Sequence, residues 1–146
     1  MTPHLIMEKR QGNNMDENLD KPGREELKAW VKQHLDTAVR ELTGKDIFES
    51  LLVEAKPAWV FPFRVLIGKV REQGQPREFQ WFICGDVPTD HVNSGVASTP
   101  RDVARHFALK WQLDAARQQE DPGGGELAEQ AEALYELVDQ SGLWPQ

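Results

Sequence analysis

The residues most able to do chemistry lie in one short segment, residues 84–91, with the sequence Cys-Gly-Asp-Val-Pro-Thr-Asp-His. The carboxylates of Asp86 and Asp90 and the imidazole of His91 could bind a divalent metal if a further ligand, either His106 or an acidic residue, completed the coordination. The thiol of Cys84 could instead be a nucleophile, with a histidine as its base. The segment therefore offers two kinds of enzymatic site, one metal-dependent and one thiol-dependent.

A structural role explains the same segment more simply. Asp and Thr next to Pro and Gly favour turns, because their side chains hydrogen-bond to nearby backbone amides. The spacing of Asp86, Asp90 and His91 matches no established metal-site pattern, and a lone Cys within an apolar strand is typical of a small core residue. We therefore predict no metal and no cofactor, and a turn that could also contact a ligand or partner. Whether these side chains meet His106 in space stays open.

A second group of polar residues follows on a predicted helix. Ser98-Thr99-Pro100 indicates the helix start, with a hydroxyl N-cap and a proline where no amide partner is needed, and the helix extends to about residue 119. It carries a basic stripe formed by Arg101, Arg105, His106 and Lys110, beside Phe107 and Trp111. The stripe could bind an acidic partner or a phosphorylated ligand. The simpler interpretation is a solvated face, or one that pairs with acidic residues of the next helix.

Apolar periodicity predicts the elements that must position these residues. Steps of three and four residues predict an amphipathic helix over Arg24–Leu42, ended by Gly44. Period-two alternation predicts a β-hairpin with strands around residues 63–68 and 79–84, and a short strand near 51–55 adds a third member. Both faces of the hairpin are apolar. We therefore expect helices to cover one face of the sheet fully and the other face to be shielded in part.

Prolines and glycines predict where the elements are interrupted. Pro57 and Pro62 have no amide proton, which places the early part of the first strand at an edge or a bulge. Residues 121–125, Asp-Pro-Gly-Gly-Gly, predict a flexible break before a last helix that begins near Leu127. After that helix, Leu143-Trp144 is expected to fold back onto the core.

These elements predict a single α+β domain. The chain has 146 residues, of which 39% are apolar, and its five Trp and six Phe are enough for a substantial core. We predict a small, mainly antiparallel sheet of two to four strands packed against about three helices. The domain is assigned to residues 23–146, and residues 1–22, which show little apolar periodicity, are assigned to a flexible N-terminal tail.

The charge distribution limits the classes of partner. The net charge of −7 arises from residues 114–140, where eight acidic residues face Arg117 alone. An acidic surface opposes nucleic-acid binding, which needs clustered basic residues. No apolar stretch is long enough to span a membrane, and a single cysteine favours a reducing compartment. We therefore predict a cytoplasmic protein without a nucleic-acid or membrane partner.

Four segments of the chain together resemble one family. They are residues 85–91, Arg105–Leu113 (Arg-His-Phe-Ala-Leu-Lys-Trp-Gln-Leu), Leu134–Leu137 (Leu-Tyr-Glu-Leu) and Leu143-Trp144. This pattern is similar to a family of short bacterial proteins, domain of unknown function 4826, over roughly residues 24 to 144. The resemblance implies a stand-alone bacterial protein and brings no activity, substrate, cofactor or catalytic residue. It adds interest to eight residues as one candidate binding cluster: Asp86, Thr89, Asp90, His91, Arg105, His106, Lys110 and Trp111.

Two classes of function remain after the sequence analysis. The first is a non-enzymatic protein-binding module of a regulatory or immunity type, which uses an acidic helix face and the loop at the strand end. Its partner would be another protein or a second copy, the latter through an exposed Trp-rich sheet face. The second is a small metal- or thiol-dependent enzyme with its site in the Cys84–His91 loop and at His106. Polar side chains that converge in a cleft with perturbed pKa values would favour the enzyme, and a flat acidic surface would favour the binding module.

Overall fold

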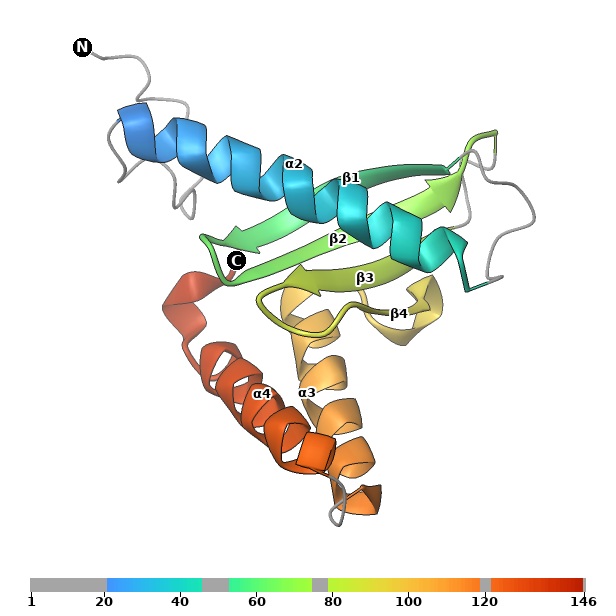
Figure 1. The fold of residues 1–146 in the computed structure, drawn as a ribbon, viewed down its shortest axis with the longest axis vertical. Helices are drawn as coiled ribbons and strands as arrows, with labels where there is room; N and C mark the ends of the chain where they lie inside the picture. Colours follow the sequence, from blue (N-terminus) through green and yellow to red (C-terminus); the bar gives the residue numbers. More distant parts are fainter. Residues whose placement is uncertain (1–20, 46–52, 75–78, 119–121, 146) are drawn as a thin grey trace.

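The computed structural model describes residues 21–45, 53–74, 79–118 and 122–145. Its strands are β1 (Val53–Phe61), β2 (Val65–Glu72), β3 (Gln80–Gly85) and β4 (Asp90–Asn93), and its helices are α2 (Lys21–Thr43), α3 (Pro100–Arg117) and α4 (Pro122–Val138), with short 3₁₀ turns at Ser94–Val96 and Ser141–Leu143. The strands form one antiparallel sheet in chain order (Figure 1). The predicted α+β class, with two to four strands and about three helices, is confirmed. Residues 1–20, most of the predicted tail, lie outside the described residues.

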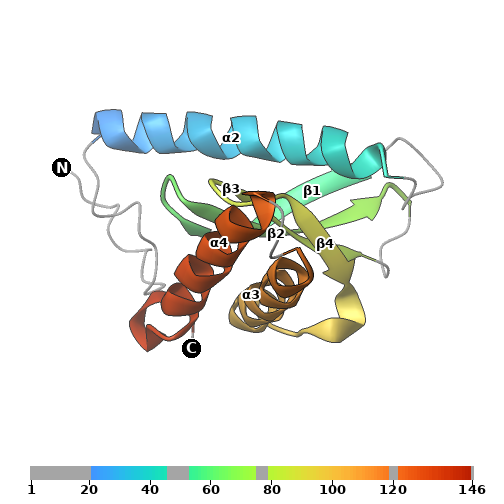
Figure 2. The same cartoon turned by 60° about the horizontal axis from the view of Figure 1, so that its bottom comes forward.

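The sheet is the middle of three layers (Figure 2). Helix α2 crosses one face, and α3 and α4 cover the other. Successive side chains of a strand point to opposite faces, so in β2 the side chains of Val65 and Ile67 join the core under α3 and α4, whereas Leu66 and Val70 join the core under α2. Two helices therefore cover one sheet face, and α2 alone covers the other, where Val53, Ala55 and Val60 are only partly buried. This agrees with the expectation that one face is shielded only in part.

The tryptophans lie in the interior. Trp59, Trp81, Trp111 and Trp144 are all buried, and each indole N–H donates a hydrogen bond to an oxygen of the protein. Trp144 stacks on Trp59 with ring centroids 3.9 Å apart, which confirms that the end of the chain folds back onto the core. Trp30, on α2, is partly buried. The described surface therefore has no Trp-rich sheet face, and the self-association expected through such a face loses its basis.

The sheet edge and the helix start follow the prediction. Pro57 lies in the edge strand β1, and the register of β1 against β2 shifts between Pro57 and Trp59, as expected for a residue without an amide proton. Thr99 is the N-cap of α3, and its hydroxyl accepts a hydrogen bond of 3.2 Å from the amide of Asp102. Thr99 thereby holds the start of the helix that carries the basic stripe.

Two boundaries differ from the prediction. The strand predicted around residues 63–68 begins only at Val65, because residues 62–64 form the turn between β1 and β2, in which Phe63 has a φ of 64°. Phe seldom adopts this left-handed conformation, but Pro62 stands at the second position of the turn, which is closed by a 3.0 Å hydrogen bond from the amide of Arg64 to the carbonyl oxygen of Phe61. Proline at that position is a turn signal, which the strand prediction did not use. The Gly-rich segment after Pro122 is the start of α4 rather than a flexible break. Proline fits the first turn of a helix, and contacts with α3 further along α4 outweigh the low helix propensity of Gly.

Candidate functional site

The strand β4 decides how the predicted site is arranged. We expected Asp90 and His91 in a loop, but both begin β4, where Asp90 pairs with Ile83 and His91 pairs with Phe82 of β3. Ile83 belongs to the core under α3 and α4, and Phe82 belongs to the core under α2. Because alternate residues of a strand point to opposite faces, the side chains of Asp90 and His91 lie on opposite sides of the sheet.

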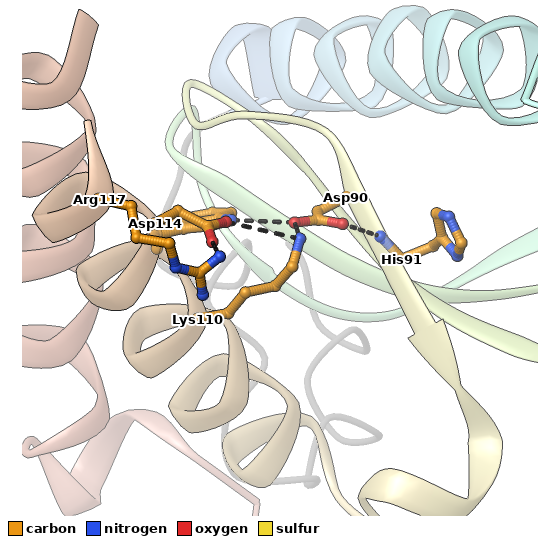
Figure 3. A network of polar contacts seen from close by, with 6 residues as sticks. Asp90, His91, Lys110, Asp114 and Arg117 are labelled. Carbon is orange, nitrogen blue, oxygen red and sulfur yellow. Dashed lines mark hydrogen bonds and ion pairs between the residues drawn. The ribbon is translucent and has the colours of Figure 1, made fainter. Parts of the chain in front are cut away.

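Asp90 is the centre of a polar network between β4 and α3 (Figure 3). Its Oδ2 lies 2.6 Å from Nζ of Lys110 and accepts a 3.1 Å hydrogen bond from Nε1 of Trp111. Its Oδ1 accepts a 2.8 Å hydrogen bond from the backbone amide of His91. The structure therefore brings together three of the eight candidate residues, Asp90, Lys110 and Trp111.

The surroundings of Asp90 favour its charged form. Burial by itself would raise the pKa of its carboxyl group. The hydrogen bonds from Lys110, Trp111 and the amide of His91, together with the charge of Lys110, outweigh burial and hold the pKa below its usual value. A carboxylate whose two oxygens are both engaged by the protein is a structural tie between β4 and α3. It is not poised to act as a general acid or base.

The network continues along α3 through residues that sequence reasoning missed. Asp114 lies 4.0 Å from Nζ of Lys110, and Nη1 of Arg117 lies 3.4 Å from Oδ1 of Asp114. The spacing of four residues from Lys110 and three residues to Arg117 is the signal that could have identified Asp114, since such residues are neighbours on a helix.

His91 points away from this network, as Figure 3 shows. Its Nδ1 is buried and has no hydrogen-bond partner in the described part of the chain. Burial lowers the pKa of His91, and the nearby charges of Lys45 and Lys110 act in the same direction, against the opposite effect of Asp90. The surroundings of His91 therefore favour the neutral form of its imidazole.

The remaining candidates lie apart from Asp90. Asp86 is exposed in the connection from β3 to β4, where its amide donates a 2.8 Å hydrogen bond to the carbonyl oxygen of Arg64, and Thr89 is partly buried just before β4. On α3, Nη1 of Arg105 forms an ion pair of 2.6 Å with Asp102, and the ring of His106 lies edge-on against the ring of Phe107. The eight residues thus do not form one cluster.

The basic stripe of α3 does not pair with the acidic side chains of α4. Arg101 reaches α4, but its Nε donates to the backbone oxygen of Val138, at 2.9 Å. Arg105 pairs within α3, and Lys110 pairs with Asp90 and Asp114. The interpretation of the stripe as the partner of the next helix is therefore wrong. Carboxylates of α3 itself, Asp102 and Asp114, and of Asp90 on β4 lie closer to these basic side chains.

Cys84 has none of the features of a reactive thiol. It is buried on the α2 side of the sheet, and its Sγ donates to the carbonyl oxygen of His34 over 3.7 Å. Burial, and next the charge of Glu41, raise the pKa of the Cys84 thiol to about 12. His106 belongs to α3, which covers the opposite face of the sheet. Within the described ranges, no three His, Cys, Asp or Glu side chains are placed to hold a metal ion.

A hollow of about 400 Å³ lies between the β3–β4 connection and the first turns of α4. One wall is Gly85, Asp86, Val87 and Pro88, and the other is Glu126, Leu127 and Gln130. Of the predicted site residues, only Asp86 lies here. Glu126 and Gln130 were missed, because they are about 40 residues away in the sequence and no local pattern connects them to Asp86.

The outer side of α4 is an exposed acidic surface. We define the acidic face as Glu129, Glu132, Glu136 and Asp139, which follow one another at steps of three, four and three residues and so lie on one side of the helix. The last turn includes Asp139, whose amide donates to the carbonyl oxygen of Tyr135 over 3.1 Å. Residues 122–140 contain no basic residue, and none of the four carboxylates forms an ion pair with a described side chain. Tyr135, beside them, is 47% exposed.

The fold and these surfaces define a class of protein, a four-stranded antiparallel meander between helices with an unpaired acidic face on its last long helix. Comparison with known families gives the family itself. The model for a domain of unknown function (DUF4826) matches residues 25–144, and the chain belongs to this family. No curated protein and no solved structure matches the chain. The helices described here include none that is long and apolar enough to cross a membrane.

Proposed function

We propose that this protein is a non-enzymatic protein-binding module that docks a basic surface of its partner on the acidic face of α4. The observation that carries the proposal is the unpaired state of Glu129, Glu132 and Glu136, all exposed and without a cationic partner among the described side chains. A regulatory or immunity-type role fits such a module. We place it in the cytoplasm, because the single buried Cys84 is a free thiol, which is typical of a reducing compartment.

The acidic face does not help the fold. Glu132 lies three residues after Glu129 and four before Glu136, so each pair places two like charges side by side, which weakens a helix. Lys and Arg side chains of a partner would offset the repulsion between these glutamates. The charge of the face would also attract such a partner from a distance and speed its association. Complementary charge therefore favours a basic protein as the occupant.

Tyr135 supplies an anchor of another kind. Its side chain is 47% exposed and stands among the carboxylates of the acidic face. Tyrosine is enriched in protein interfaces. Its large apolar ring is fixed by only a few side-chain torsions, and it also carries a hydroxyl group that can form a hydrogen bond. An acidic surface around an exposed aromatic side chain has the composition of a docking site.

The enzymatic alternative has less support. The thiol version needs a thiolate, and burial holds the Cys84 thiol protonated. The metal version needs the side chains of Asp90 and His91 to converge, and they lie on opposite faces of the sheet. Asp90, moreover, is already held by Lys110 and Trp111.

Salt-dependent capture with matched variants tests the proposal. Three forms of the chain are used to capture proteins from an extract of the cells in which the protein naturally occurs. They are the intact chain, a Glu129→Gln/Glu132→Gln/Glu136→Gln variant and a control Glu25→Gln/Glu26→Gln/Glu41→Gln variant. The control removes the same charge from exposed positions on α2. We expect the intact chain and the control to retain one stoichiometric partner that elutes with salt, and the α4 variant to bind it about tenfold more weakly or worse.

The retained complex is then rebuilt from purified components and weighed by light scattering. If the complex contains only a second copy of the 16.6 kDa chain, the protein self-associates and the proposal of a basic partner protein is overturned. Equal loss of binding in the α4 variant and the α2 control would show that net charge, rather than the acidic face, drives the association, and would overturn the proposal.

A further inference from the structure

The hollow beside α4 is an open depression that is large enough to admit one side chain. Its volume of about 400 Å³ is within the usual range of small ligand sites. Glu126 in its wall lies one helical turn before Glu129 of the acidic face. A protein that docks on the acidic face and extends one turn toward the start of α4 would reach the hollow.

Carboxylates stand on both walls of the hollow. Asp86 comes from the β3–β4 connection and Glu126 from α4, and neither forms an ion pair with any side chain that the structure describes. Gln130 adds an amide oxygen that can accept a hydrogen bond. Three acceptor groups on two sides match a cation that carries several N–H donors in one plane.

The rest of the lining is apolar. Val87 and Pro88 on one wall and Leu127 on the other offer hydrocarbon surface between the polar groups. The side chain that fits such a lining has a long methylene stem and a charged end, because the stem can lie against apolar groups while the end reaches the acceptors.

One wall of the hollow is held in place by the backbone. Gly85 has a φ of 115°, and a Cβ atom at this position would lie 2.7 Å from the carbonyl oxygen of Arg64. The amide of Asp86 donates to the same oxygen over 2.8 Å. The connection is thereby tied to the β1–β2 turn, and a preformed wall lowers the entropic cost of binding.

We infer that the hollow between Gly85–Pro88 and Glu126–Gln130 binds an arginine side chain of the partner that docks on the acidic face. This inference rests on the proposed function and names its specificity pocket. Arginine fits better than lysine, because its planar guanidinium carries five N–H donors and can bond two carboxylates at once.

The test is an NMR titration of the ¹⁵N-labelled full chain with N-acetyl-arginine methylamide. Two matched probes are the lysine and citrulline derivatives, and citrulline has the shape of arginine without its charge. We expect saturable shifts with millimolar affinity at the amides of Gly85, Asp86, Val87, Glu126, Leu127 and Gln130, weaker binding of the lysine probe and no binding of the citrulline probe. Shifts of equal size along residues 129–139, or equal binding of citrulline, would overturn the pocket.

Two variants with the same loss of charge sharpen the result. Asp86→Asn/Glu126→Gln should weaken binding of the arginine probe about tenfold or more, whereas Glu25→Gln/Glu26→Gln, at exposed positions on α2, should leave it within about twofold. Equal binding of the probe to both variants contradicts the pocket. If a variant does not fold, the contrast between the arginine and citrulline probes on the intact chain still decides.

The outcomes separate this inference from the proposed function. Partner capture that depends on Glu129, Glu132 and Glu136, without binding of the arginine probe, overturns the pocket and leaves the docking surface standing. Binding of the probe in the hollow without any partner on the acidic face overturns the proposed function, and the hollow then stands as a site for a free guanidinium compound rather than for a docked protein.

Discussion

Asp90 and the glutamates of α4 carry the same charge in opposite settings. The side chain of Asp90 is 15% exposed, and Lys110, Trp111 and the amide of His91 together bind both of its oxygens. The carboxylates of the acidic face are exposed and pair with no described cation. The first setting uses a charge to hold two elements together, and the second leaves charges available to a partner.

The difference separates two surfaces that the sequence analysis had singled out together, the residues around Asp90 and the acidic helix face. Asp90, Lys110 and Trp111 have the residue types of a functional site, but their contacts with one another occupy them. The glutamates of α4 have the residue types of an ordinary solvated helix, and their distinguishing property is the lack of a neighbouring cation. Neutralising each kind of carboxylate should therefore have opposite effects on stability.

The largest effect is expected from Asp90→Ala. The change removes the ion pair with Lys110 and leaves the buried indole N–H of Trp111 without its acceptor. We expect the free energy of unfolding to fall by about 2–3 kcal/mol in urea titrations. The matched control is Asp36→Ala, which breaks an exposed ion pair with Lys32 and should cost less than about 0.5 kcal/mol. Equal losses in the two variants would contradict the structural role of Asp90.

A smaller, pH-dependent effect follows from the lowered pKa of Asp90. A carboxyl group whose pKa is lower in the folded state stabilises the fold above its unfolded pKa, near the usual 3.8, and this contribution is lost as the pH falls through the folded value. The difference in unfolding free energy between the intact chain and Asp90→Asn should therefore be constant from about pH 5 to 7 and shrink below about pH 4. A difference that instead grew toward low pH would show that the pKa of Asp90 is raised.

Much of the fold could be predicted from the sequence because its signals are local. The apolar periodicity of α2 and the N-cap at Thr99 each depend on a few neighbouring residues, and both are confirmed. The turn at Phe63 was missed although Pro62 favours the second position of a turn, because Phe63 seldom adopts the positive φ that it has there.

The candidate site was harder to predict because its geometry depends on β4. Asp90–Asn93 has only four residues and includes Asp and Asn, which are depleted in strands, so the sequence predicts a loop there. Because this segment is a strand, the side chain of Asp90 points toward α3 and that of His91 points toward α2. That Asp86 and Glu126 line the same hollow likewise depends on the tertiary packing of α4 and not on any spacing in the chain.

The smallest effect is expected from Glu132→Gln on α4. The change removes the repulsion of Glu132 with Glu129 and Glu136 and should raise the free energy of unfolding by about 0.3 kcal/mol at low ionic strength. The gain should vanish in about 1 M salt, where exposed charges are screened. Destabilisation by this change in thermal or urea unfolding would mean that Glu132 has a stabilising partner within the fold.

The central claim, that the acidic face of α4 docks a basic protein, is tested most directly by zero-length carbodiimide cross-linking in a native extract. The reagent joins a carboxylate to a lysine amine only when the two are in contact, and mass spectrometry identifies both residues. We predict amide links from Glu129, Glu132 and Glu136 to lysines of one partner protein, and loss of these links in high salt. Links from Glu25, Glu26 or Glu41 of α2 to the partner, with none from α4, would contradict the account.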